Sequence, residues 1–180
     1  DPQGFAERLL RPMPRRRNRH AELGTAFHAW VEARLGVQPL ITDEDLPGAA
    51  DENIGSPQEL AELKESFERL DYAHRTPAGL EVPFSLSIAG RLIRGRIDAV
   101  FPAGPETPDG QQWEVVDWKT SSRDEADELQ LAIYRLAWAD LAGVSPESVG
   151  AAFVFVRSGT VLRPPSLPGA SAIEQLLTAT

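Results

Sequence analysis

The sequence predicts an α/β domain in which a small mixed sheet of four or more strands is flanked by helices. The chain has 180 residues, of which 42% are hydrophobic, so it is long enough for one domain with a substantial core. Apolar residues recur at helical spacing in some segments and at alternate positions in others. Because these two kinds of segment follow one another and no internal repeat is present, a single α/β domain is the expected architecture.

Two helices are expected ahead of the sheet. Residues 20–36 place Leu23 and Phe27 on one face of a helix and end at Gly36, a residue that commonly stops helices. Residues 56–73 open with Ser-Pro and repeat leucine and phenylalanine at helical spacing. The stretch between these segments is rich in proline, glycine and acids, so a loop is expected there.

A hairpin, a third strand and a helical crossover are expected next. Residues 80–101 alternate apolar and polar residues and are interrupted near Ala89 and Gly90, which is typical of two strands joined by a tight turn. The remaining expected elements are a strand over 113–120, a strong helix over 123–143, a strand over 148–159 and, after a Pro-rich connection, a short helix from about Ser171.

The charge is unevenly distributed. The net charge is −9, yet residues 1–20 hold six arginines against two acids, and residues 43–71 hold ten acids against two bases. We therefore divide the chain into a basic arm or linker at 1–20 and a folded domain at 21–180. The arm is either a solvated linker or a segment in which arginines such as Arg15, Arg16 and Arg17 contact phosphate groups.

Composition excludes several classes of protein. With no cysteine, the chain cannot form a disulfide framework, a zinc knuckle or a Cys-ligated iron–sulfur cluster, so any metal must be held by oxygen and imidazole. No segment has the length of a membrane span and no leader is visible, so we expect a cytoplasmic protein with no membrane partner. Because the chain opens at Asp1 and its one methionine is Met13, we expect a fragment of a longer polypeptide.

The chemistry is expected where the sheet carries Asp98, Asp117 and Lys119. Sixteen of the eighteen basic residues are arginine, so a lysine two residues after an aspartate on a strand is unusual here. Asp117 and Lys119 share one face of their strand. Asp98 has the opposite parity to Ile97 and Ala99, which we place in the core, and both acids are expected at neighbouring strand ends, at one end of the hairpin.

Two close carboxylates predict a divalent cation, and their oxygen ligands suit Mg²⁺ or Mn²⁺. Such an ion polarises a phosphoryl oxygen and lowers the pKa of a bound water. A neighbouring ammonium orients that water or stabilises the charge that develops on phosphate. Lysine suits this task better than arginine, because it is a compact charge whose pKa can shift.

Four motifs together resemble a known family. "GRIDAVF" followed by "WEVVDWKTS" resembles the split acid pair and D-x-K of the PD-(D/E)XK nuclease superfamily, which has a restriction-endonuclease-like core. "GTAFH" and "QLAIY" resemble the Gly-x-x-x-His and Gln-x-x-x-Tyr helices of its RecB-type branch. The resemblance implies the following roles: His28, Asp98, Asp117 and the carbonyl of Trp118 as metal ligands; Lys119 as catalytic together with Asp98 and Asp117; Gln130 and Tyr134 as residues that contact DNA or support the site; and Glu81, more loosely, as a further site acid.

The resemblance implies a divalent-metal-dependent deoxyribonuclease, expected to be an exonuclease, in DNA end processing and recombination repair. The absence of cysteine is similar to members without an iron–sulfur cluster, and the arginine-rich composition resembles actinobacterial helicase–nuclease subunits. No Walker-type motif is present, so DNA and a helicase motor, in the same or a partner chain, are the expected partners, in a nucleoid-associated setting.

Other interpretations of the same residues stay open at this point. Asp98 can pair with Arg94 or Arg96, and Asp117 with Lys119, as surface ion pairs of little energetic value. Gln130 and Tyr134, four residues apart on a helix, can be an ordinary boundary pair. The corresponding alternative functions are a catalytically silent nuclease-like domain that binds DNA or braces a partner subunit, and a plain protein-interaction module.

Overall fold

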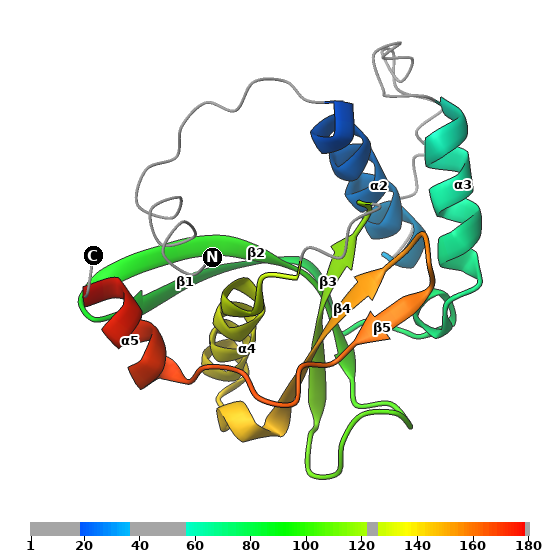
Figure 1. Ribbon diagram of the computed structural model, residues 1–180. Coiled ribbons are helices and arrows are strands. Elements are labelled where there is room, and N and C mark those ends of the chain that lie inside the picture. The colour runs from blue at the N-terminus through cyan, green and yellow to red at the C-terminus, as the bar shows by residue number, and fades with distance from the viewer. Residues whose placement is uncertain (1–18, 37–56, 122–125, 179–180) are drawn as a thin grey trace.

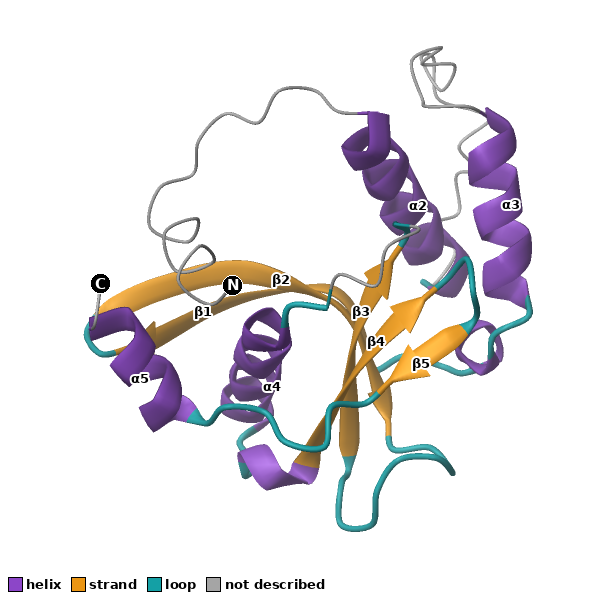
Figure 2. Cartoon of the chain, in the orientation of Figure 1, coloured by secondary structure: helices purple, strands orange, loops and turns teal. Residues whose placement is uncertain are grey.

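The computed structural model describes residues 19–36, 57–121 and 126–178, whose arrangement is shown in Figures 1 and 2. In chain order the elements are α2 (Arg19–Leu35), α3 (Pro57–Glu68), the short 3₁₀ helix η2 (Asp71–His74), β1 (Gly79–Ile88), β2 (Arg91–Pro102), β3 (Trp113–Lys119), α4 (Glu128–Ala142), the 3₁₀ helix η3 (Pro146–Ser148), β4 (Val149–Phe155), β5 (Thr160–Leu162) and α5 (Ala170–Thr178).

The described strands form one mixed sheet in the order β1-β2-β3-β4-β5. Antiparallel pairing joins β1 to β2, β2 to β3, and β4 to β5, whereas β3 and β4 are parallel. Parallel neighbours need a crossover connection, and α4 supplies it between β3 and β4. The predicted fold class, a mixed sheet of at least four strands flanked by helices, is confirmed.

Helices cover both faces of the sheet and enclose two hydrophobic cores. On one face α4 and α5 pack against residues such as Val115, and on the other α2 and α3 pack against residues such as Val116 and Trp118. Figure 1 shows α2 and α3 together on one side and α4 on the other. Successive residues of β3 point into different cores because side chains alternate along a strand, so β3 is buried on both faces.

The predicted helices are present, and one of them starts later than expected. The helix predicted over 123–143 begins at Glu128, where the side chain of Asp127 accepts a hydrogen bond from the backbone N–H of Leu129, as an N-cap residue does. It stops at Gly143, whose φ of 66° lies in the left-handed region that favours glycine. The cap at Asp127 therefore decides where α4 begins.

Two further outcomes concern the strands. The tight turn expected near Ala89 and Gly90 is present, with φ values of 53° and 72°, which suit a two-residue hairpin turn. The short strand β5 was not predicted, because three residues are too few to show an alternating pattern.

The expected alternation of β2 fails at Asp98. Val82 of β1 and Ile97 of β2 pack with the α4 core, whereas Leu80 and Ala99, two residues further along, belong to the α2 core. The prediction that Ile97 and Ala99 share a face is therefore wrong. The change of face occurs at Glu81 and Asp98, and Glu81 has a φ of 46°, uncommon for a residue with a side chain.

Two expectations concern the ends of the molecule and the membrane. Residues 1–18, with Arg15, Arg16 and Arg17 of the predicted arm, lie outside the described residues. Within the described ranges, no helix combines the length and apolar character that crossing a bilayer requires.

Candidate active site

Asp98 and Asp117 lie on adjacent antiparallel strands. Ala99, which follows Asp98, and Val116, which precedes Asp117, are register partners. The two aspartates therefore occupy the next pair of positions along β2 and β3. Both are buried, with exposed fractions of 8% for Asp98 and 3% for Asp117. The expectation that both acids end strands is wrong for Asp98, because β2 continues to Pro102. Strand pairing brings the carboxylates together.

Burial and mutual repulsion make the ionised state of this pair costly. Burial, and then the charge of Asp117, raise the pKa of Asp98 well above its ordinary value, although its Oδ2 accepts a 2.9 Å hydrogen bond from the backbone N–H of Trp118. Burial also raises the pKa of Asp117, while Lys119 and then His28 act to lower it. Ionised carboxylates held in this way favour a bound cation.

His28 and Glu81 complete a group that can hold a metal ion. Helix α2 buries Phe27 and leaves the next residue, His28, half-buried on the flank of its apolar face. The imidazole Nδ1 lies 3.6 Å from Glu81 Oε1 and 3.6 Å from Asp98 Oδ1. One ligand atom from each of these three residues lies within 4.8 Å of the others.

This donor set fits Mg²⁺ or Mn²⁺. It offers carboxylate oxygens and one imidazole nitrogen, which suit hard or borderline divalent ions. The structure brings together His28 and Asp98, two of the metal ligands that the family resemblance implies. It adds Glu81, which the resemblance connected with the site only loosely. Asp117 lies outside this trio and neighbours Asp98, with its Oδ2 turned to Lys119.

Lys119 is held between Asp117 and helix α4. Its Nζ lies 2.7 Å from Asp117 Oδ2, an ion pair whose direction is not that of a well-aligned hydrogen bond, and it donates a 3.4 Å hydrogen bond to Gln130 Oε1. Gln130 Nε2 in turn donates to the Tyr134 hydroxyl at 2.9 Å. Burial, and then the charges of Asp98 and Asp117, raise the pKa of Tyr134, so its hydroxyl stays protonated.

Trp118 has two separate roles in the local structure. Its side chain is buried in the α2 core, with its ring centroid 5.4 Å from that of Phe67 and 5.7 Å from that of Tyr72. Its backbone N–H holds Asp98, as described above. The atom that Trp118 can offer to a metal is therefore its carbonyl oxygen, as the family resemblance implies.

Only some of the ion pairs that the sequence allowed as an alternative to a metal site are present. Lys119 does pair with Asp117, but both are largely buried, so this is not a surface pair. Asp98 pairs with neither Arg94 nor Arg96, since its charged neighbours are His28 and the other site residues. Gln130 and Tyr134 do form a boundary pair, and the pair is connected to Lys119.

A second polar cluster was missed by sequence reasoning. Glu114 of β3 has no exposed surface, and its carboxylate accepts hydrogen bonds from the Tyr72 hydroxyl at 2.5 Å and from Arg163 Nε at 2.7 Å. No sequence signal connects these residues, which lie 42 and 49 positions apart.

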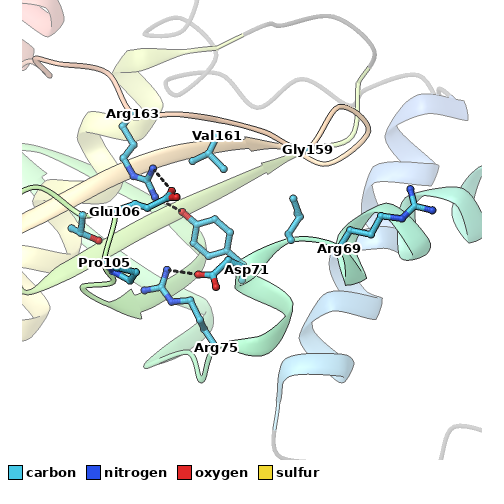
Figure 3. Close-up of a pocket in the computed structure, with 11 residues that line it drawn as sticks. Arg69, Asp71, Arg75, Pro105, Glu106, Gly159, Val161 and Arg163 are labelled. Atoms are coloured by element: carbon cyan, nitrogen blue, oxygen red, sulfur yellow. Dashed lines mark hydrogen bonds and ion pairs between the residues drawn. The ribbon is translucent and has the colours of Figure 1, made fainter.

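A pocket of about 190 Å³ adjoins this cluster, with Arg75 beside Asp71 and Arg163 beside Glu106 (Figure 3). The pocket does not include the Asp98–Asp117 pair. These two arginines, and Arg69, which also lines the pocket and pairs with Glu65, each have an acid as partner, so the pocket holds no unpaired arginine for a ligand.

Comparison with protein families identifies the chain. The model of the PD-(D/E)XK nuclease superfamily matches residues 5–177, and the chain belongs to this superfamily of hydrolytic nucleases, which use divalent metal ions. The resemblance inferred from the motifs is confirmed at this level. A search of curated proteins finds no match.

A solved structure shares the fold. The structure of a Eubacterium rectale protein named "Putative exonuclease" aligns with a TM-score of 0.54 at 11% sequence identity, over 93% of this chain and 65% of that one. This chain thus spans about two thirds of that protein's length. At this identity the likeness shows the fold alone.

Proposed function

We propose that this domain hydrolyses DNA phosphodiester bonds in a reaction that depends on Mg²⁺ or Mn²⁺. The observation that supports the proposal is the convergence of the buried Asp98–Asp117 pair, the His28–Glu81 group and Lys119 at one place on the sheet. A silent domain would have no need to keep two buried like charges together, because their repulsion opposes folding.

Each residue has a definite task in this proposal. Asp98, His28 and Glu81, together with Asp117 and the Trp118 carbonyl, hold the ion. When bound, the ion polarises a phosphoryl oxygen and lowers the pKa of a water molecule.

In this proposal the Lys119 ammonium stabilises charge that develops on the phosphate. Gln130 fixes the position of this ammonium, and Tyr134 orients the Gln130 amide. The two helix residues thereby act on the reaction through Lys119.

The wider role follows from the motif resemblance. We propose a RecB-type nuclease module of an actinobacterial helicase–nuclease that acts as an exonuclease at DNA ends in recombination repair, in the cytoplasm and at the nucleoid. Its partners would be DNA and a helicase motor region of the same or another chain. Arg15, Arg16 and Arg17 would bind the DNA backbone in this setting.

The experiment is digestion of end-labelled linear DNA and of circular DNA. Cleavage is expected with Mn²⁺ or Mg²⁺ and not in excess chelator, and Ca²⁺ is expected to bind with little cleavage because it is a poorer Lewis acid. An exonuclease degrades the linear form and spares the circle. Full cleavage in chelator would refute the metal mechanism, and absence of cleavage with every ion would favour the silent DNA-binding domain.

A further inference from the structure

Among the described residues, the outer part of the β1–β2 hairpin, residues 82–97, has packing partners on one face only. Its apolar residues Phe84, Ile88 and Ile93 belong to the core under α4 and α5. None of the described residues in this part joins the opposite core, whose hairpin members are Leu80, Ala99 and Phe101 at the base. Figure 1 shows the hairpin extending past α4 toward α5. The exposed residues of its other face are Pro83, Ser85, Ser87, Leu92, Arg94 and Arg96.

The charge of this outer face is opposite to that of the whole chain. Residues 82–97 contain three arginines and no acid, although the net charge of the chain is −9. Within the described ranges, the side chains of Arg94 and Arg96 form no ion pair or hydrogen bond, unlike those of Arg75 and Arg163 beside the pocket. Two exposed guanidinium groups are therefore available to an anionic partner.

The packing of Phe84 determines the face of β2 from which these two arginines project. Gly95, which lies between them, is the register partner of Phe84, and a Cβ atom at Gly95 would lie 2.8 Å from Phe84 Cζ. The Phe84 ring also packs edge-on against Tyr134 of α4, with centroids 5.9 Å apart. Because Phe84 covers this face of β2, Arg94 and Arg96 project from the other face, roughly 7 Å apart along the strand.

The two arginines lie on the strand that carries Asp98, on the hairpin side of the position where β2 changes face. Arg96 precedes Asp98 by two residues on β2, and Arg94 lies two residues further out. A guanidinium group binds phosphate oxygens through two parallel hydrogen bonds, independently of base sequence. We propose that Arg94 and Arg96 bind successive backbone phosphates of the DNA strand that enters the Asp98–Asp117 site, an inference that rests on the proposed function for the choice of DNA.

The test measures binding apart from cleavage. Fluorescence anisotropy of labelled single-stranded and duplex oligonucleotides is recorded in chelator over a range of salt concentrations. The R94A/R96A variant is expected to bind more weakly and to reduce the log–log salt slope by about 1.4 on single strands or about 1.8 on duplex, from about 0.7 or 0.9 for each lost contact. The strand form whose slope changes by its full expected value is the one that the hairpin binds through both arginines.

Two matched variants make the test specific. Arg91→Ala removes one positive charge from the same strand, but Arg91 is on the same, packed face as Ile93, so the slope of this variant is expected to match that of the wild type. R94K/R96K keeps both charges, and most of the binding is expected to return. Both arginines are exposed, so the unfolding midpoint of R94A/R96A is expected to equal that of the wild type.

Each outcome bears on one of the two proposals. Equal affinity and slope for R94A/R96A and Arg91→Ala would overturn the hairpin surface while leaving cleavage by the site intact. Arginine-dependent binding by a protein that cleaves nothing would support the hairpin surface and refute the nuclease function.

Discussion

Strand β3 carries two buried carboxylates, Glu114 and Asp117, in opposite surroundings. Glu114 has no exposed surface and receives hydrogen bonds from Tyr72 and from the charged Arg163, so its charge is matched where it lies. Burial, and then the Glu114 charge, raise the pKa of Tyr72, which therefore remains a protonated donor. The protein itself therefore supplies both the hydrogen-bond donors and the positive charge for this carboxylate.

Asp117 lies three residues further along the same strand. Its partner is the single ammonium of Lys119, and the next strand places a second carboxylate, Asp98, beside it. The negative charge is therefore in excess at this end of β3. The comparison suggests a criterion: burial of an acid alone does not point to a functional site, whereas burial without sufficient positive charge from the protein marks a candidate site.

The largest effect is expected from Asp117→Asn. The change removes one charge from the excess, so we expect Mn²⁺ affinity to fall and cleavage to decrease by about 1,000-fold, the upper end for one electrostatic contact in a reacting site. Calorimetric Mn²⁺ binding and a cleavage rate measure the two effects. The matched control is Asp140→Asn at an exposed position of α4, which should leave both unchanged. Cleavage by Asp117→Asn at the control rate would remove Asp117 from the site.

We expect Arg163→Ala to affect the stability of the fold rather than the cleavage reaction. It leaves the buried Glu114 charge without its cation, and we expect a loss of about 3 kcal/mol in the free energy of unfolding, the lower end for breaking a buried pair because Arg163 is partly exposed. Denaturant unfolding measures this loss. Arg69→Ala breaks the exposed pair with Glu65 and should cost less than about 1 kcal/mol. Equal losses in the two variants would contradict the distinction.

Lys119→Ala separates positioning of the ion from stabilisation of the transition state. We expect Mn²⁺ binding to remain or to improve slightly, while cleavage decreases by roughly 100-fold. Lys119→Arg should not restore the rate, because the planar guanidinium cannot occupy the same point. Lys64→Ala, the change of the other lysine, is the control. A normal rate in Lys119→Ala would reduce Lys119 to an ion-pair partner.

The smallest effect is expected from Asp98→Asn, and it has the opposite sign. In chelator we expect a gain of about 1 kcal/mol in stability, because the amide removes like-charge repulsion and its oxygen can still accept from the Trp118 N–H. The folded-state pKa of Asp98 is raised, so the folded protein binds more protons than the unfolded chain above about pH 4, and wild-type stability declines as pH rises.

The stability of the Asp98→Asn variant should decline less steeply than that of the wild type as pH rises. Thermal unfolding in chelator at several pH values measures this difference. Mn²⁺ should raise the unfolding midpoint of the wild type and have little effect on the variant. A less stable variant in chelator would show that Asp98 is a structural group like Glu114.

Much of the fold could be predicted because its signals are local. The apolar spacing around Phe27 and the turn at Ala89 and Gly90 each involve a few neighbouring residues. The start of α4 was predicted too early, since a helix cap such as Asp127 is decided by one side chain that points back to the backbone. The face of Ile97 relative to Ala99 could not be predicted, because strict alternation assumes a regular strand.

Those residues of the candidate site that lie in sequence motifs could be predicted. Asp98, Asp117 and Lys119 lie in motifs of recognisable order, and their roles remain predictions to be tested by the variants above. The Tyr72–Glu114–Arg163 cluster could not be predicted, because its members come from three distant segments with no shared pattern. Glu114 alone reads as an ordinary polar residue at the start of a strand.

The pairing of β1 with β2 has a consequence for the order of folding. These strands are consecutive in the chain and joined by a two-residue turn, so Glu81 and Asp98 can meet after closure of a short loop. The parallel pairing of β3 with β4 must wait for the α4 crossover, and His28 comes from a helix more than fifty residues earlier than Glu81. We expect the hairpin acids to come together early in folding, with the imidazole and the lysine arriving as the distant segments dock.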